Sequence, residues 1–315
     1  MGREDLIATT RDLLARAGYV VSSPLNLRSI CFDIVARKDD NLLIIKVLSN
    51  IDAFSKENAE EMKILSDALS ASALLIGERS SSGALEEGII YSRFDVPIIS
   101  NETLMSYILE EEAPAIYAAP GGLYVKLDGE LLREIRERSG ISLGVLAETA
   151  GVSRRTIQMY ESGMGAMIDA ALRIEEFFDM PIIMPLNPFG YRTGSSVGKH
   201  ELSGDVRTGS EVMNKLMEIG FSITPLAKSP FDALSRVDDV LILTGAGSND
   251  EKLMQRALIA SEISDLVGRL SVVIVDSEPA RENINKTAVV SNKELKKMDE
   301  SGTLTDLVLS RSTKR

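Results

Sequence analysis

The side chains able to support nucleophilic, redox or metal chemistry are few in this 315-residue chain. Cys31 is the only cysteine and His200 the only histidine, which excludes a disulfide within the chain and the usual thiolate zinc cluster. Cys31 lies in the apolar run Ile30-Cys31-Phe32, which is typical of a buried core thiol. His200 has no partner for a triad or a metal site. We therefore expect no catalytic residue, cofactor or metal, and a reducing, cytoplasmic setting.

A second group of polar side chains lies near the middle of the chain, in a segment with helical spacing. Leu131, Leu132 and Ile135 form one face of a predicted helix that ends at Gly140. Ser142 then caps a second predicted helix, Leu143–Ala150. The inner surface of that second helix is expected to be formed by Val145, Leu146 and Thr149.

The residues that follow predict a tight turn and a third helix. Gly151 tolerates a left-handed backbone, and Val152 fills the angle between the helices. The third helix is expected from Arg154 to Tyr160.

The region Leu127–Asp179 resembles the lambda-repressor-like helix-turn-helix family over about 55 residues. The matching residues are Leu146-Ala147, Gly151-Val152-Ser153, Thr156-Ile157, Tyr160-Glu161, Gly163 and the closing helix Ala170–Ile174. The resemblance implies that the third helix enters the major groove of double-stranded DNA. Arginine is the commonest reader of guanine. The implied DNA-binding residues are Ser153, Arg154, Arg155, Thr156, Gln158 and Met159. The alternative is a purely structural three-helix domain.

The charge of the chain opposes DNA binding by a single copy. The net charge is −12, whereas neutralising phosphates requires a basic surface. The loop Met164–Met167 also lacks the basic residues often found in the family. We therefore expect a homodimer that docks two copies on half-sites ~34 Å apart. No apolar run approaches the ~18 residues of a membrane span, so no membrane partner is expected.

The sequence also repeats itself on either side of the helical segment. Four blocks recur in the same order at offsets near 200: residues 13–21 with 215–223, 32–47 with 231–245, 66–78 with 264–278, and 97–104 with 288–295. Each copy shows the order helix, strand, strand, helix, strand, short strand, helix, with apolar runs typical of buried strands. We therefore predict two α/β domains, 1–120 and 206–315, which flank a helix-turn-helix domain at 122–186 and a linker at 187–205.

The order of elements in each copy resembles the restriction-endonuclease-like, or PD-(D/E)XK, fold. In that family two acidic residues bind magnesium and a lysine stabilises charge. Asp33 matches the first position and Lys46 the last, but Ile44 replaces the middle carboxylate, and isoleucine offers no oxygen ligand. Glu4 is a possible substitute. The second copy has Asp232 at the first position.

In the second copy, Ile242 is aligned with the position of the second acidic residue and Thr244 with that of the lysine. The nuclease sites of both copies are therefore expected to be degenerate and inactive. The fold class is thus α/β plus all-α: two restriction-endonuclease-like α/β domains flanking a lambda-repressor-like helix-turn-helix domain. The whole arrangement resembles a group of archaeal helix-turn-helix transcriptional regulators. It favours a sequence-specific DNA-binding regulator that is not an enzyme. The alternatives are a structure-directed DNA nuclease and a protein-interaction co-regulator that does not bind DNA.

Overall fold

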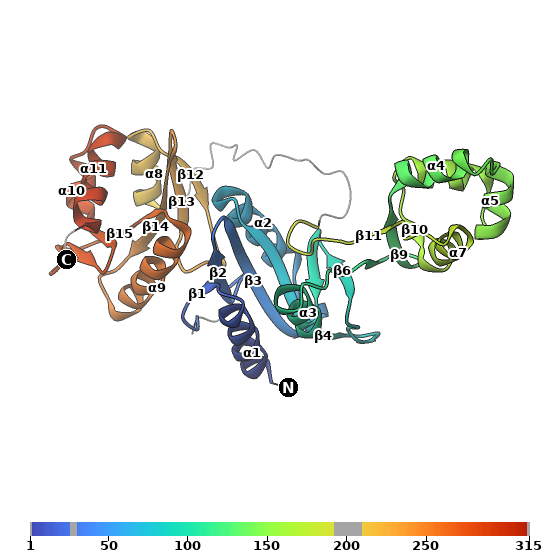
Figure 1. The fold of residues 1–315 in the computed structure, drawn as a ribbon. Helices are drawn as coiled ribbons and strands as arrows, with labels where there is room; N and C mark the ends of the chain where they lie inside the picture. The colour runs from blue at the N-terminus through green and yellow to red at the C-terminus, as the bar shows by residue number, and fades with distance from the viewer. Residues whose placement is uncertain (1, 26–29, 192–209, 314–315) are drawn as a thin grey trace. The chain divides into compact units, whose positions relative to one another are not determined.

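The computed structural model describes residues 2–25, 30–191 and 210–313 (Figure 1). His200 and residues 192–205 of the predicted linker lie outside the described residues. Contacts divide the chain into two compact units. The first unit comprises Met1–Ala17, Val47–Phe54 and Leu74–Gly194, and the second comprises Gly18–Lys46, Ser55–Ala73 and Ser195–Arg315.

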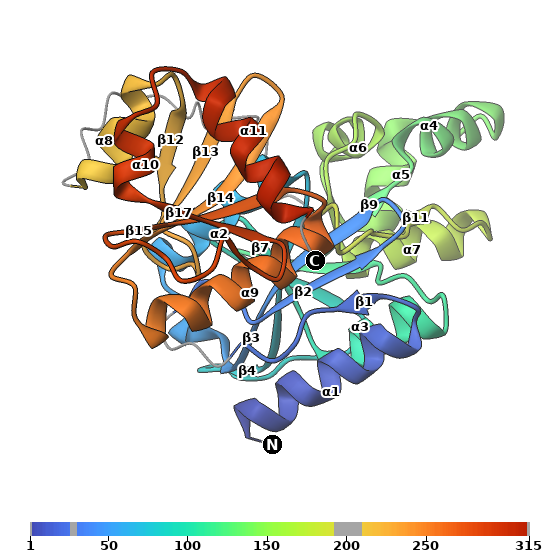
Figure 2. The same ribbon diagram turned by 90° about the vertical axis from the view of Figure 1, so that its left-hand side faces the viewer.

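The first unit begins with an α/β portion. Its elements are α1 (Arg3–Arg16), the end of β3 (Asn41–Asn50), the short 3-10 helix η1 (Ile51–Ala53), β4 (Ser72–Ser80), β5 (Gly83–Ala84), β6 (Ile89–Arg93), β7 (Val96–Ile99) and α3 (Asn101–Leu109). Helices α1 and α3 lie side by side (Figures 1 and 2). The buried hydroxyl of Thr10 donates to the side-chain oxygen of Asn101 at 2.9 Å, which joins the two helices.

Four helices follow in the same unit. They are α4 (Gly129–Arg138), α5 (Leu143–Ala150), α6 (Arg154–Glu161) and α7 (Ile168–Phe178). Leu132, Ile135, Leu146, Ile157 and Ile174 form the centre of one apolar core. The spacing of apolar residues and the serine caps therefore predicted α4, α5 and α6 closely.

One prediction about this core was wrong. Val145 is 46% exposed, and the inward face of α5 is formed by Leu146, Ala147 and Ala150. Thr149 is half-buried, and its hydroxyl donates to the carbonyl of Val145. Because α5 is apolar around most of its circumference, its contacts with α6 and α7 decide which face is buried.

Short strands surround these helices, and the sequence pattern did not predict them. Strands β8 (Ile116–Ala119) and β9 (Gly122–Leu127) form a hairpin that precedes α4. The two-residue strands β10 (Ala166–Met167) and β11 (Ile183–Met184) both pair with β9. Because β8 also pairs with β6, these strands continue the first sheet up to the helical domain.

The second unit contains the start of the chain's first sheet and the C-terminal α/β domain. Its elements are β1 (Val20–Val21), β2 (Ile34–Lys38), the beginning of β3, α2 (Lys56–Leu69), α8 (Glu211–Glu218), β12 (Ser222–Pro225), β13 (Ala233–Val237), β14 (Val240–Gly247), α9 (Glu251–Val267), β15 (Leu270–Val275), β16 (Asn283–Ile284), β17 (Thr287–Ser291), α10 (Asn292–Lys296) and α11 (Ser301–Ser312). None of the helices within the described residues is both long and apolar enough to span a membrane.

The two sheets share one strand order, as the internal repeat predicted. The first sheet begins β1-β2-β3-β4-β7-β6, and the second runs β12-β13-β14-β15-β17-β16. The directions also correspond: β2 and β3 are antiparallel like β13 and β14, and β4 and β7 are parallel like β15 and β17. The repeated sequence blocks therefore form the same fold twice.

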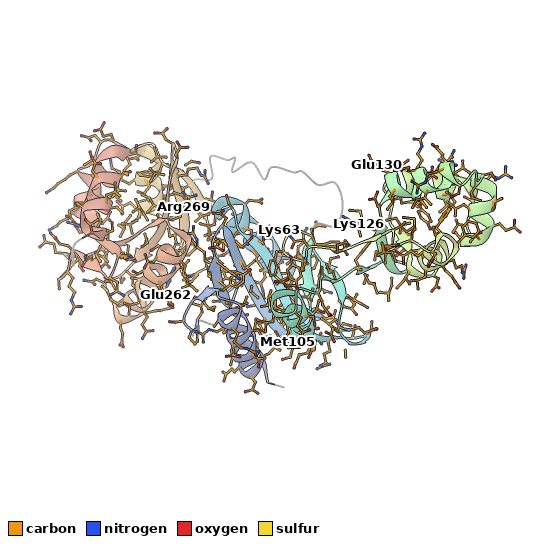
Figure 3. The ribbon with its side chains drawn as sticks, viewed as in Figure 1. Lys63, Met105, Lys126, Glu130, Glu262 and Arg269 are labelled. Atoms are coloured by element: carbon orange, nitrogen blue, oxygen red, sulfur yellow. The ribbon has the colours of Figure 1, made fainter. Side chains whose placement is uncertain are left out.

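Within the second unit, residues of the two repeats contact each other through helix α9. The backbone N–H of Ser23 donates to the carboxylate of Glu262 on α9, which is labelled in Figure 3. Arg37 on β2 donates to the carbonyl of Leu266 at 3.1 Å. The two copies are thus associated within one chain.

Candidate nucleic-acid interface

Two serines and one glycine set the geometry of the helix-turn-helix. The Ser142 hydroxyl accepts from the N–H of Val145 at 3.2 Å, and the Ser153 hydroxyl accepts from the N–H of Thr156 at 3.0 Å. Each serine therefore caps the first turn of its helix, α5 or α6. Gly151 ends α5 with φ +70°, the left-handed conformation that glycine adopts without a steric cost.

The six residues predicted to bind DNA lie on α6 or, in the case of Ser153, cap its first turn, but they differ in how far they are exposed to solvent. Arg154, Arg155, Gln158 and Met159 are exposed, whereas Thr156 is half-buried. The hydroxyls of Ser153 and Thr156 hydrogen-bond to each other at 2.8 Å. These two side chains therefore stabilise the start of α6, while the other four are accessible to a ligand.

The arginines of the helical domain differ in their partners. On α4, Arg133 pairs with Glu137 at 3.0 Å and Arg138 pairs with Glu134 at 3.5 Å. Arg173 on α7 donates to the carbonyl of Ala150.

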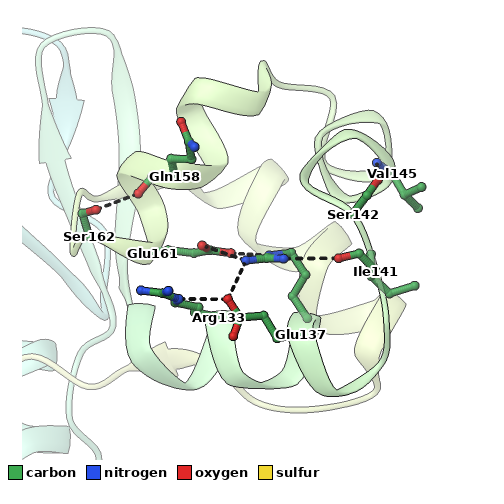
Figure 4. A network of polar contacts seen from close by, with 9 residues as sticks. Arg133, Glu137, Ile141, Ser142, Val145, Gln158, Glu161 and Ser162 are labelled. Atoms are coloured by element: carbon green, nitrogen blue, oxygen red, sulfur yellow. Dashed lines mark hydrogen bonds and ion pairs between the residues drawn. The ribbon is translucent and has the colours of Figure 1, made fainter.

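Arg136 is the most enclosed of these arginines. Its guanidinium pairs with Glu161 through two nitrogens and also donates to the carbonyl of Ile141 (Figure 4). Arg154 and Arg155, by contrast, have no carboxylate or carbonyl partner among the residues that the structure describes. The start of α6 thus carries two arginines for which the described residues provide neither an acidic partner nor the backbone carbonyl that Arg173 has.

The loop after Gly163 has a structural role that explains its composition. Ala166 pairs with Val125 and Met167 pairs with Tyr124, so this segment forms β10 at the edge of β9. A Cβ on Gly165 would clash with the hydroxyl of Tyr117, so a larger residue there would require the tyrosine side chain to move. The loop lacks basic residues because it packs against the hairpin.

The residues predicted to form the nuclease site of the first copy, Asp33 and Lys46, form a buried ion pair. Lys46 Nζ lies 3.3 Å from Asp33 Oδ1 and donates to the carbonyl of Ile30 at 2.7 Å. Both charged side chains are more than nine-tenths buried, and Ile44 is fully buried. The lysine therefore neutralises the aspartate directly.

A segment of the second copy covers this site. The carboxylate of Glu61 on α2 accepts the N–H groups of Ala227 and Lys228, each at 2.7 Å. The N–H of Cys31 donates to the carbonyl of Lys228, also at 2.7 Å. Residues 227–229, here called the covering segment, are therefore held by Glu61 on one side and by Cys31, two positions before Asp33, on the other.

Burial also explains the chemistry of the only thiol. Cys31 is fully buried, and this burial, together with the charge of Glu61, raises the pKa of the thiol to about 12. The thiol therefore stays protonated, as expected of a core residue. Burial likewise raises the pKa of Glu61, although its backbone hydrogen bonds oppose the change.

The corresponding site in the second copy was aligned one residue out of register. In the structure Ala233 pairs with Thr244 just as Ile34 pairs with Ile45. The counterpart of Lys46 is therefore Gly245, and not Thr244 as predicted. The hairpins β2–β3 and β13–β14 both turn through two aspartates, so their strands pair in the same register. A shift of the alignment by one residue would exchange the buried and exposed faces of the second strand.

By the same register, the counterpart of Ile44 is Leu243 rather than Ile242. Asp232 remains at the first position, but Arg256 on α9 binds it at 2.7 Å and the N–H of Ala246 donates to its other oxygen at 2.8 Å. A guanidinium thus neutralises the carboxylate in this copy. The described residues include no cluster of three histidine, cysteine or acidic side chains suited to a metal ion, and exposed Glu4 on α1 belongs to the other compact unit.

Two known domain families match the chain. Residues 3–114 match the PD-(D/E)XK superfamily domain, and residues 132–183 match the helix-turn-helix family. The first match includes Asp33 and Lys46, and the second begins within α4 and extends beyond the end of α7.

Full-length relatives are found among archaea. A protein of Methanocella arvoryzae is 40% identical over 319 residues, covering 100% of this chain and 98% of its own length. Relatives in Methanosarcina mazei and Natronomonas pharaonis are 37% and 36% identical, each over 99% of this chain and 98% and 99% of their own lengths. Each name includes the words "Putative HTH-type transcriptional regulatory protein". No solved structure matches the chain.

Proposed function

Because this chain belongs to a family of archaeal HTH-type transcriptional regulatory proteins, we propose that it recognises a specific duplex DNA sequence through α6. Its helix-turn-helix domain makes it a DNA-binding regulator of transcription. The proposal adds sequence specificity, a two-fold mode of binding, and a non-catalytic role for the α/β copies.

The unpaired arginines at the start of α6 carry the proposal. In a domain with many acidic residues, arginines that were only solubilising would be expected to form surface ion pairs, as Arg133 and Arg138 do. Arg154 and Arg155 instead present free guanidinium groups at the end of a helix that is exposed on one side. Guanidinium groups bind phosphates and guanine edges, and the N-terminal residues of a recognition helix meet the base edges.

The test is selection of bound duplexes from a random library by the full chain, followed by affinity measurements. Replacing Arg154 and Arg155 by alanine should cost about 1–3 kcal/mol for each lost base contact. The matched control replaces Arg133 and Arg138, which are also exposed but are paired with glutamates, and should bind as the parent does. Equal affinities for the two double variants would refute the assignment of α6. Failure to enrich any sequence would favour the protein-interaction co-regulator.

A homodimer is the second part of the proposal. One α6 helix with two free arginines neutralises few phosphates, and affinity rises when two copies bind two half-sites. We expect a footprint with two-fold symmetry and half-sites about one helical turn apart. A footprint restricted to one half-site, together with a monomeric mass in solution, would contradict this part.

Neither α/β copy is proposed to hydrolyse DNA. In the first copy Lys46 neutralises Asp33 and the covering segment contacts Glu61 and Cys31, and in the second copy Arg256 holds Asp232. Magnesium requires oxygen ligands that Ile44 and Leu243 do not supply. Supercoiled DNA should therefore remain intact in magnesium. Nicking that is abolished by both Asp33→Ala and Lys46→Ala would establish the nuclease alternative, since a contaminant would not respond to those changes.

The cytoplasm is the proposed location. A DNA partner and a single buried, protonated thiol both suit a reducing compartment that contains the chromosome.

A further inference from the structure

Three side chains of α6 line one shallow hollow on the proposed DNA-binding face. Arg155, Gln158 and Met159 surround a depression of about 500 Å³, together with residues 162–164. Positions three and four apart lie on the same side of a helix, which explains why these residues gather there. In Figure 4 the side chain of Gln158 points away from the ion pairs between α4 and α6. The hollow is therefore open to a ligand that approaches α6 from outside the domain.

Arg154 lies on a different side of the helix. A Cβ placed on Gly144 of α5 would lie 3.0 Å from two guanidinium nitrogens of Arg154. The guanidinium thus rests on the first turn of α5 and does not line the hollow. The two adjacent arginines therefore face different parts of a bound duplex.

Met159 is the one long apolar side chain of α6 that is not in the core. It is 43% exposed, whereas Ile157 and Tyr160 are buried. Arg155, which has no acidic partner among the described residues, and the side-chain amide of Gln158 line the same hollow as Met159. In the major groove the thymine methyl group is the apolar feature of the base edges, and it lies beside the N6 and N7 atoms of the paired adenine, which a glutamine amide binds.

We propose that Met159 contacts a thymine methyl group in the recognised DNA, that Gln158 binds the adenine of an adjacent or the same A·T pair, and that Arg155 reads a neighbouring guanine. Arg154 positions the domain on the DNA backbone and does not read a base. The inference rests on the proposed function and specifies the base composition of each half-site. The occupant of the hollow is thus duplex DNA with a guanine next to an A·T pair.

The test replaces each thymine of the selected duplex, one at a time, by deoxyuridine, which lacks only the methyl group. One position should lower the affinity of the full chain roughly fourfold, the loss expected for one buried methyl group. Met159→Ala should bind the thymine and deoxyuridine duplexes equally at that position. Met184→Ala, which alters an equally exposed methionine on β11, should retain the fourfold difference.

The arginines give a second readout. Arg155→Ala should lose the preference for guanine at one position, while Arg154→Ala should lower affinity for all sequences by the same factor. If the parent protein selects a sequence but tolerates every deoxyuridine, or if Met159→Ala keeps the penalty, this inference is overturned while the proposed function stands. If no duplex is selected, both fail together. Unchanged circular dichroism of the variants excludes loss of fold as the cause.

Discussion

The ion pair between Arg136 and Glu161 offers the sharpest test of how the helical domain is stabilised. It joins α4 to the end of α6, and the two side chains are only 11% and 9% exposed. Two guanidinium nitrogens bind the two carboxylate oxygens, and a third nitrogen donates to the carbonyl of Ile141 (Figure 4). Glu161→Ala would remove the carboxylate and leave the guanidinium enclosed.

The expected cost follows from this burial. Breaking a buried pair by removing one partner costs about 3–5 kcal/mol, because the remaining charge loses its compensation. Arg136 also has Glu137 at 3.4 Å, so we expect the lower end, ~3 kcal/mol. That is a large share of the ~5–15 kcal/mol that stabilises a typical domain. Replacing both partners by methionine should cost less than the single change, since no charge remains buried.

Amide hydrogen exchange on the full chain measures the stability of the helical domain residue by residue. A loss of ~3 kcal/mol should speed exchange of the protected amides in α4 to α6 by about a hundredfold. Glu137→Ala is the matched control, because Glu137 also binds Arg136 but is half exposed and contributes little. Equal exchange rates in Glu161→Ala and Glu137→Ala would refute the reasoning that burial makes this pair strong.

Three further changes test other contacts. A Cβ on Gly129 would lie 2.7 Å from backbone carbonyl oxygens at the end of α6, so Gly129→Ala should lower the melting temperature by an amount equivalent to about 1–3 kcal/mol. A Cβ on Gly302 would have no atom within 4 Å, so Gly302→Ala should not lower the melting temperature. Equal melting temperatures of the two variants would show that the clash at Gly129 does not occur. Glu61→Ala should speed exchange at the amides of the covering segment more than Glu61→Gln, which keeps one acceptor oxygen; unchanged rates in both variants would show that Glu61 does not hold the segment. Burial opposes ionisation of Glu294, but hydrogen bonds from Arg311 and its own helix cap outweigh it and hold its pKa at about 2. The pKa of Glu294 is lower in the folded state than in the unfolded chain, where it is about 4.3. Its ionised carboxylate therefore contributes fully to the free energy of unfolding above that pH, and the contribution is lost as the pH falls toward 2. The difference in urea midpoint between the parent and Glu294→Gln should therefore shrink over that range, and a constant difference would contradict this.

The helices of the DNA-binding domain were predictable because their signals are local. Ser142 and Ser153 each accept a backbone N–H three residues later, and Gly151 is where the turn needs a left-handed residue. The exposure of Val145 was not predictable in this way. The run Leu143–Ala150 is apolar on most of its surface, so its burial depends on which side meets α6 and α7.

The short strands next to these helices also show how far local sequence signals reach. The hairpin of β8 and β9 has a local turn signal, Pro120-Gly121-Gly122, although no strand was predicted on either side of it. Strands β10 and β11 are two residues long and exist only because β9 is their partner. Their sequences carry no alternating pattern long enough to indicate a strand.

The register of the second degenerate site required the fold. Sequence blocks aligned Thr244 with Lys46, but the paired strands place Gly245 there. Strand register is set by hydrogen bonding across the hairpin, and an alignment by residue type is easily shifted by one position. The conclusion that the second copy lacks a lysine at this position is unchanged by the correction, but the residues that occupy the site are different ones.

The sequence by itself determined the domain types, the repeat, the helices α4 to α6 and the isoleucine at position 44, because each depends on residue identity or on spacing within a few positions. Only the tertiary structure decided which arginines are free, which α6 side chains share one hollow, and that residues 227–229 contact Glu61 and Cys31. Glu61 and Lys228 are 167 positions apart, and no local propensity links them. Such contacts form because burial and hydrogen bonding are satisfied over the whole chain, which is a property of the assembled fold.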